Sequence, residues 1–314
     1  MRYYFAPLEG ITDSFFRRIH HTYFPQGVER YYTPFFSPTV HRALTPREAR
    51  ELPPAQLLDV TVIPQLLTKV PEDFLWMAQQ CKDLGYTEVN LNLGCPSGTV
   101  TAKGKGSGML RDLDALDRFL DAIYNQAPLP ISVKTRIGFE NPEEFVPLME
   151  IFNRYPIREL TIHPRVRTAF YKGSISMEAF DYAAKNSRNP LCFNGDLVRL
   201  SQIEDLQARY PMLEAVMLGR GLIADPGMLT PEGTTPQALE NYLNTLMETY
   251  IEAFGSARNT MFRMKEHWSM LIRKFDDAEK LGKRLKKTTD LDEYRSITAQ
   301  IIHTLPMRKE LPDW

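Results

Sequence analysis

Short apolar segments alternate with helix-forming segments through residues 1–233, and this alternation limits the possible folds more than any other feature of the chain. Eight segments have the length and composition of strands: 3–6, 30–36, 61–67, 88–93, 131–135, 159–163, 191–194 and 215–218. Helical patterns lie between them, at 71–84, 112–126, 142–154, 176–187 and 199–209. Eight strands joined by helices predict a parallel (β/α)8 TIM barrel, an α/β fold.

The pattern changes after a turn-rich stretch at 226–236 that is rich in Pro and Gly. Helical segments follow at 237–254, 258–275, 277–287 and 290–304, with no strand pattern among them. We therefore expect a barrel domain over residues 1–233 and a small all-α domain over residues 237–314.

Composition excludes several classes of protein. Hydrophobic residues make up 43% and charged residues 25%, as in ordinary globular proteins, and no apolar run approaches the ~20 residues that a membrane span needs. The three cysteines, at 81, 95 and 192, form neither a disulfide framework nor a metal-site spacing. We expect a cytoplasmic protein with no metal, no membrane segment and no obligate protein partner.

Charge is distributed unevenly, although the net charge is only −1. The stretch 258–287 holds 10 basic and 4 acidic residues, whereas residues 1–255 carry an excess of acidic ones. Such asymmetry suggests an anionic partner for the helical segments, and a solvated helix surface is the alternative.

The most specific local motif runs from Asn90 to Gly98, with the sequence NLNLGCPSG. Its first half alternates like a strand, and Gly-Cys-Pro-Ser-Gly then forces a turn. Cys95 is thereby placed at the carboxyl end of a strand, which is the edge of a TIM barrel that carries its chemistry. The simpler interpretation is a small buried thiol, as most free cysteines are.

Polar residues recur at this same end of nearly every predicted strand, where unpaired burial would cost several kcal/mol. The residues at these strand ends, polar and neighbouring ones together, are in chain order Pro7, Leu8 and Glu9; Gln65; Asn92 and Cys95; Lys134 and Arg136; His163 and Arg165; Asn194, Gly195 and Asp196; and Gly219 and Arg220.

The last two groups follow strands seven and eight, where TIM barrels commonly bind phosphate. Their glycines allow close backbone approach, and Arg220 supplies charge. A phosphorylated cofactor in the barrel mouth follows, and flavin mononucleotide (FMN) fits. Lys134 could then stabilise negative charge near the flavin ring, and Gln65 could hydrogen-bond the edge of the ring.

Taken together, these motifs resemble the tRNA-dihydrouridine synthase family along essentially the whole chain. The motifs that carry the resemblance are Ala6-Pro7, Asn90-x-Asn92-x-Gly94-Cys95-Pro96, Val133-Lys134-Thr135-Arg136, Asn194-Gly195-Asp196 and Gly219-Arg220-Gly221. The resemblance implies an FMN-dependent barrel with a helical RNA-binding domain, which reduces the C5=C6 bond of a uridine in tRNA with electrons from NADPH.

The resemblance also implies roles for individual residues. Cys95 would donate the proton. FMN would be bound by Pro7, Leu8, Glu9, Gln65, Lys134, His163, Asn194, Gly195, Asp196, Gly219 and Arg220. Asn92, Lys134, Arg136 and His163 would hold the uracil. From charge and position, and not from the resemblance, we also expect RNA to contact Arg165, Lys103, Lys105, Arg263, Lys265, Arg273 and Lys274. Leu8 replaces the family's usual Met, a volume-conserving change, and Val166 replaces a Thr, which removes one hydroxyl.

Four alternatives stay open at this point. The chain could be a flavin barrel that acts on a small pyrimidine or enone, although a small substrate needs no basic helical surface. It could be a dihydrouridine synthase that acts on ribosomal RNA. It could be a hydrolase using Cys95 and His163, which would leave the phosphate loops without a role. It could also be an RNA-binding folding helper.

Overall fold

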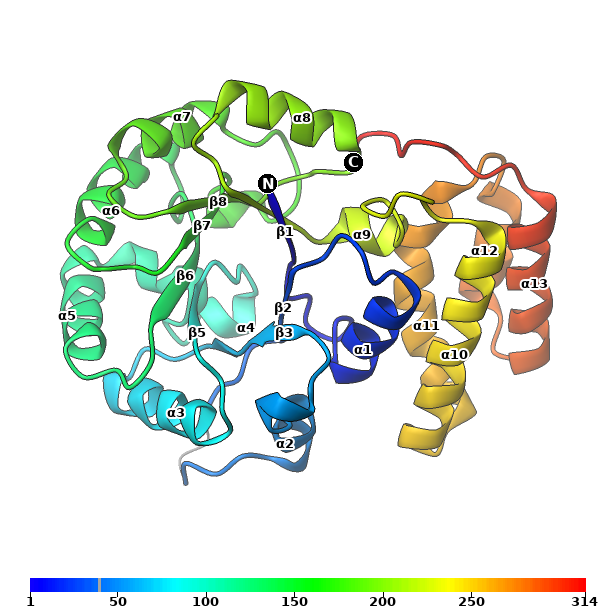
Figure 1. Ribbon diagram of the computed structural model, residues 1–314, viewed down its shortest axis with the longest axis horizontal. Coiled ribbons are helices and arrows are strands. Elements are labelled where there is room, and N and C mark those ends of the chain that lie inside the picture. Colours follow the sequence, from blue (N-terminus) through cyan, green and yellow to red (C-terminus); the bar gives the residue numbers. More distant parts are fainter. Residues whose placement is uncertain (39–40) are drawn as a thin grey trace. The chain divides into compact units, whose positions relative to one another are not determined.

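A single nine-stranded sheet forms the centre of the computed structural model, which describes residues 1–38 and 41–314. The strands are β1 (Arg2–Phe5), β2 (Arg30–Tyr32), β3 (Thr61–Ile63), β4 (Gln65–Leu66), β5 (Val89–Leu93), β6 (Ile131–Arg136), β7 (Leu160–His163), β8 (Leu191–Phe193) and β9 (Ala215–Leu218). Their order is β3-β2-β1-β9-β8-β7-β6-β5-β4. This nearly closed parallel barrel confirms the predicted fold class (Figure 1).

One segment of chain serves both ends of the sheet. The expected strand at 61–67 is divided at Pro64, which has no N–H to donate to a sheet ladder. β3 pairs with β2, whereas β4 pairs with β5 on the other side. The Pro64 carbonyl accepts a hydrogen bond from the Asn90 N–H at 2.8 Å. The two ends of the sheet therefore meet at this one segment.

Helices lie outside the strands at the positions that the apolar pattern predicts (Figure 1). They are α3 (Pro71–Asp83), α5 (Leu113–Tyr124), α6 (Phe145–Phe152) and α7 (Met177–Asn186), followed in the chain by α8 (Leu200–Arg209). α5 begins at Asp112, whose side chain accepts the Ala115 N–H at 2.9 Å. On β5, Leu91 is fully buried on the outer face. Because successive side chains of a strand point to opposite faces, Asn90 and Asn92 lie on the inner face.

Several short elements were not predicted from the sequence. They are α1 (Ser14–Tyr23), α2 (Pro46–Glu51), α4 (Gly98–Thr101) and α9 (Arg220–Ala224), with 3-10 turns η1 (Ala55–Leu57), η2 (Gly106–Arg111), η3 (Pro142–Glu144), η4 (Arg167–Ala169) and η5 (Ile272–Lys274). α1 packs on α10 (Pro236–Phe254), and the ring of Phe16 stacks on His267 at 5.3 Å. The stability of α1 therefore depends on a distant part of the sequence.

The chain divides into two compact units. The barrel unit comprises residues 1–7, 30–195 and 207–217, and the helical unit comprises 8–29, 196–206 and 218–314. The helical unit contains α10, α11 (Ala257–Leu271), α12 (Glu279–Lys287) and α13 (Leu291–Thr304). No helix in the described part of the chain has the length and apolar character to cross a membrane.

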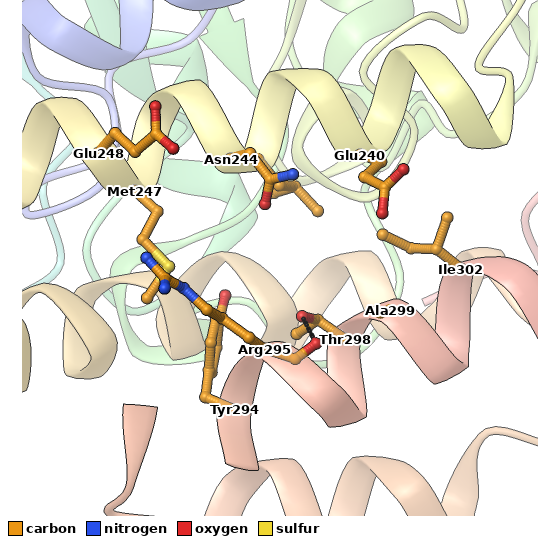
Figure 2. A pocket seen from close by; sticks show the side chains of 10 residues that line it. Glu240, Asn244, Met247, Glu248, Tyr294, Arg295, Thr298, Ala299 and Ile302 are labelled. Atoms are coloured by element: carbon orange, nitrogen blue, oxygen red, sulfur yellow. Dashed lines mark hydrogen bonds between the residues drawn. The ribbon is translucent and has the colours of Figure 1, made fainter. Parts of the chain in front are cut away.

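The helical unit has its own apolar core. Leu246, Tyr250 and Met264 are fully buried, and the Trp268 indole N–H donates to the Tyr294 hydroxyl at 2.9 Å. A groove of about 320 Å³ runs between α10 and α13 (Figure 2). Carboxylates and an amide of α10 line one side of it, and Arg295 and Thr298 of α13 line the other. None of its ten lining residues belongs to the predicted site.

Candidate active site

A ladder of amide side chains crosses the inner face of the barrel. Gln65 donates to Asn90 at 2.8 Å, and Asn90 donates to the Ser132 hydroxyl at 2.9 Å. Asn92 donates to the Gln65 side-chain oxygen at 2.8 Å. Gln65 and Asn90 are fully buried, so each needs these partners to offset the loss of hydration. The ladder fixes the three strands β4, β5 and β6 against one another.

Asn92 also sets the turn that carries the thiol. Its side-chain oxygen accepts the backbone N–H groups of Gly94 at 3.0 Å and Cys95 at 2.9 Å. The amide thus caps the end of β5 while its nitrogen holds the ladder. Because both ends of one side chain are occupied, the position of Cys95 is tied directly to the barrel interior.

A glycine-containing loop holds Cys95 from the other side. The Cys95 carbonyl accepts hydrogen bonds from the Ser107 N–H at 3.2 Å and the Ser107 hydroxyl at 2.8 Å. Gly106 has a φ of +58°, and a Cβ there would lie 3.0 Å from the same carbonyl. Only glycine meets both demands without strain. The backbone of Cys95 is fixed, while its side chain is partly exposed.

Lys134 lies beside this turn, in register with Asn92 on the neighbouring strand β6. Burial, reinforced by the charge of Arg136, lowers the pKa of Lys134 to about 8. Its ammonium has no hydrogen-bond or ion-pair partner among the described residues. A partly buried cation that has no partner is costly. An electron-rich or anionic group bound inside the barrel would supply what Lys134 lacks, so these residues fit a flavin.

The side chain of Arg136 joins separate backbone segments of the site. Its guanidinium donates to the carbonyls of Gly94 at 3.0 Å, Val166 at 2.9 Å and Phe170 at 2.6 Å. The residue is 1% exposed. These three bonds join the Cys95 turn to the loop after β7, so Arg136 holds the site together and has little capacity left for a base.

His163 is the last residue of β7, and Arg165 lies two residues after it. The Nε2 of His163 lies 3.2 Å from Nη1 of Arg165, and the Arg165 guanidinium donates to the Gly173 carbonyl, at 2.5 Å from Nη2. Both residues are less than a tenth exposed. Arg165 therefore anchors the loop at 166–173 and offers no free surface to RNA.

That loop presents two aromatic side chains that the sequence analysis missed. Phe170 is 42% exposed and Tyr171 is 47% exposed. The Arg136 guanidinium lies 5.3 Å from the Tyr171 ring centroid, and Arg167 lies 5.0 Å from that of Phe170. Phe170 has a φ of +49°, which is strained for an aromatic residue. The sequence signal that could have identified them is a pair of adjacent aromatic residues in a loop predicted to follow a strand.

The other predicted residues of the barrel unit have simple placements. Pro7 lies two residues after the end of β1, and Lys103 is exposed in the turn after α4. The Lys105 ammonium donates to the Ser37 hydroxyl at 2.7 Å, and burial lowers its pKa. Asn194 donates to the Met217 carbonyl at 2.7 Å, which joins the ends of β8 and β9. Gly195 packs closely against Ile175.

In the helical unit, Arg220 pairs with Asp196 at 2.6 Å. Asp196 adopts a φ of +44°, which turns the chain sharply. Gly219 directly precedes Arg220, and a Cβ at Gly221 would collide with the carbonyl of Leu197. Leu8 donates its N–H to Thr12 at 2.8 Å, and Glu9 is exposed beside it. Glycine at position 221 thus allows α9 to pack closely against the backbone at residues 197–198.

The four basic residues expected to bind RNA are used within the helical unit. Arg263 pairs with Asp13 at 2.5 Å, and Lys274 pairs with Asp225 at 2.5 Å with its side chain 4% exposed. Lys265 donates to carbonyls at the end of α12, including that of Thr288. Arg273 donates to the carbonyls of residues 312 and 313. Lys274 in particular is almost fully buried in its ion pair.

A different basic surface lies on α12. Leu281 and Leu285, one turn apart, are buried, and the side chains of Lys280, Lys283, Lys286 and Lys287 are exposed. These four lysines have no ion-pair or hydrogen-bond partner for their side chains within the described chain. We refer to them as the α12 lysines. Their spacing around the two leucines is visible in the sequence, but which face of the helix is buried depends on packing against the rest of the unit.

Within the described residues, no group of three or more His, Cys, Asp or Glu side chains could hold a metal ion. Cys81 and Cys192 are fully buried, and burial raises the pKa of Cys81 to about 12 and that of Cys192 well above its usual range. Both have the character of inert core thiols, in contrast to Cys95.

Comparison with known proteins gives a consistent result. The family model described as "Dihydrouridine synthase (Dus)" matches residues 4–305. A probable tRNA-dihydrouridine synthase 1 from Synechocystis sp. is 25% identical and covers 95% of this chain and 86% of its own length. A probable tRNA-dihydrouridine synthase from Staphylococcus aureus is 26% identical, with 93% and 90% covered.

Solved structures support the architecture. A morphinone reductase variant in complex with tetrahydroNAD has a TM-score of 0.51 at 11% identity, covering 78% of this chain and 90% of its own. A histamine dehydrogenase from Rhizobium has a TM-score of 0.54 at 12% identity, covering 86% of this chain and 49% of its own. At such low identity these likenesses establish the fold alone.

The difference between the three thiols predicts selective labelling. In the folded protein at pH 8, Ellman's reagent should react rapidly with one thiol per chain, because Cys81 and Cys192 are fully buried and kept protonated. Cys95→Ala should abolish this rapid phase, and unfolding should expose all three thiols in the unchanged chain. A rapid reaction of two or more thiols in the native protein would contradict the placement of the buried pair.

Proposed function

The chain belongs to the dihydrouridine synthase family, and from that membership we propose that it reduces the C5=C6 bond of a uridine in tRNA to give 5,6-dihydrouridine. FMN would be its bound cofactor and NADPH its electron donor. The observation that carries the proposal is the Cys95 thiol, held at the end of β5 by Asn92, beside the ammonium of Lys134, which has no partner among the described residues. tRNA as substrate also makes the cytoplasm the natural location.

The residues that would hold the cofactor are Pro7, Leu8, Glu9, Gln65, Lys134, His163, Asn194, Gly195, Asp196, Gly219 and Arg220. Reduced FMN supplies the hydride that C6 of the uracil receives. Lys134 would stabilise negative charge on the flavin ring, and Arg220 would bind the phosphate.

Cys95 would act as the general acid. Hydride addition at C6 leaves an electron pair at C5, and the Sγ–H bond of Cys95 breaks as the C5–H bond forms. An ordinary cysteine, with a pKa of ~8.5, is protonated at neutral pH, so this role needs no activating base. Because the side chain of Cys95 is partly exposed, water can return the proton to the thiolate.

The exposed loop after β7 would receive the RNA bases. A uridine must leave the stack to reach a barrel interior, and aromatic rings can stack on bases that are unpaired. Phe170 and Tyr171 offer such rings, and the chain of bonds from Arg136 fixes them relative to Cys95. Lys103 and Lys105 lie in the barrel unit on the loop that holds Cys95 and would meet phosphates.

The α12 lysines would form the main phosphate-binding surface. α12 holds five basic residues and one acidic residue, and the side chains of its four lysines have no protein partner among the described residues. A flavin barrel acting on a small pyrimidine or enone would have no use for this surface. Mapping dihydrouridine in total RNA from a strain lacking the gene distinguishes tRNA from ribosomal RNA and identifies the position modified.

Cys95→Ala should reduce dihydrouridine formation by about 10²–10⁴-fold, the usual contribution of a general acid. Flavin content and NADPH oxidation should be retained, because both precede protonation of the base. Cys81→Ala is the matched control, since it removes a thiol from the core. Product formation by Cys95→Ala at the wild-type rate, measured by mass spectrometry of digested tRNA, would remove Cys95 from the mechanism.

Flavin binding should weaken as the pH rises through about 8. Lys134 has a pKa lowered to about 8, so it is charged below that pH and neutral above it. If the charged form binds flavin, the dissociation constant should rise by up to about tenfold between pH 7 and pH 9. The measurement uses flavin fluorescence in Cys95→Ala protein, so that the thiol does not titrate. Lys134→Met should show weaker binding and lose this pH dependence; an unchanged profile would place the flavin away from Lys134.

Replacing all four α12 lysines with glutamine should weaken tRNA binding and flatten its dependence on salt. The log–log slope should fall by about 0.7 to 0.9 for each phosphate that the variant no longer neutralises. A matched control replaces four exposed basic residues of the barrel unit, Lys82, Arg118, Lys185 and Arg188, with glutamine. Both variants lose the same charge. Equal slopes in the two variants would show that net charge, and not α12, governs binding.

A further inference from the structure

Trp314 contacts two arginines of the helical unit. The Arg220 guanidinium lies 4.2 Å from the centroid of its indole, and that of Arg273 lies 4.4 Å from the same centroid. These distances are well inside the range of about 6 Å in which a cation is attracted to an aromatic face. One ring therefore holds two guanidinium groups at once, and one of them is the arginine assigned above to the cofactor phosphate.

The position of Trp314 is fixed by the preceding residues. Arg199 donates to the Leu311 carbonyl at 2.8 Å and pairs with Asp313 at 2.7 Å. Leu311 is buried against Val198 and Ala224, and Trp314 packs against this cluster. The indole is therefore part of a built structure and does not depend on its arginine contacts to stay in place.

Arg220 is restrained in two independent directions. Its edge donates to Asp196 at 2.6 Å, and its face lies on the Trp314 ring. A guanidinium carries its five donors in a planar fork, a geometry that matches the oxygens of a phosphate. A long side chain that is already ordered loses less entropy when it binds an anion.

Two further observations point to an anion at this place. The Trp314 indole N–H is buried and has no hydrogen-bond partner within the described chain, which is a costly state that a ligand oxygen would relieve. Burial, followed by the nearby charges of Arg220 and Arg308, lowers the pKa of Arg273. A bound phosphate would offset the repulsion between these cations.

We propose that Trp314 is a positioning residue for the cofactor phosphate, because it holds the Arg220 guanidinium in the orientation that binds it. The inference rests on the proposed function, since it takes Arg220 as the phosphate ligand. It assigns to residues 305–314 a part in retaining FMN that the sequence motifs do not indicate.

The test compares FMN with riboflavin, which lacks the phosphate. Full-length protein freed of flavin is titrated with each, and flavin fluorescence gives the dissociation constants. Trp314→Ala should weaken FMN binding about tenfold and leave riboflavin binding within about twofold. Trp314→Phe, which keeps a ring but loses the N–H, should fall between Trp314→Ala and wild type. Lys309→Ala, which removes an exposed charge from the same segment, should bind both flavins as wild type does.

A double-mutant cycle identifies the route of the effect. Arg220→Ala should erase the preference for FMN over riboflavin, and adding Trp314→Ala to it should change FMN binding by less than about twofold. The inference is overturned if Trp314→Ala binds FMN normally, if both flavins weaken equally, or if the two substitutions act independently. Failure of the wild-type protein to prefer FMN over riboflavin would instead count against the proposed cofactor site.

Discussion

The structure depends on one amide side chain that is committed at both ends. Asn92 donates to Gln65 inside the barrel and accepts the N–H groups of Gly94 and Cys95 at the end of β5. The bond to Gln65 is part of the ladder that fixes three strands. The two bonds from Gly94 and Cys95 determine where the thiol lies. A shift of one residue in the register of β5 would move Asn92 to the apolar outer face and break all of these bonds. The fold and the reactive group are therefore specified by the same side chain.

Strand–helix alternation predicts most of this fold. Burial of the strands on both faces leaves an apolar pattern that can be recognised locally in the sequence. The barrel, its outer helices and the four long helices after residue 236 all follow from apolar periodicity and capping residues. The division of one expected strand at Pro64 and the helix α1 do not follow. The division at Pro64 can be predicted only if it is known that the two ends of the sheet share this segment. Helix α1 can be predicted only together with its packing partner α10, which lies far along the chain.

For the site, residue type and position at a strand end were enough to nominate Cys95 and Lys134, but not to say how charged side chains are used. Arg136, Arg165 and Lys274 are cations in plausible places, and the structure satisfies each with carbonyls or a carboxylate. A sequence shows charges without their partners. The α12 lysines have no partner among the described residues and lie on the exposed face of their helix, and which face is exposed depends on tertiary packing.

The helical unit is assembled from three separate stretches of the chain, 8–29, 196–206 and 218–314. Within it, Asp13 caps α1, accepts the Tyr250 hydroxyl at 3.0 Å and pairs with Arg263. A cut at a single point in the sequence therefore cannot release it as a module, nor can a foreign helical domain be joined there without leaving α1 and Asp13 exposed. Exchange of RNA specificity between relatives by recombination would need matched substitutions near the beginning of the chain, so these distant stretches are expected to change together over evolution.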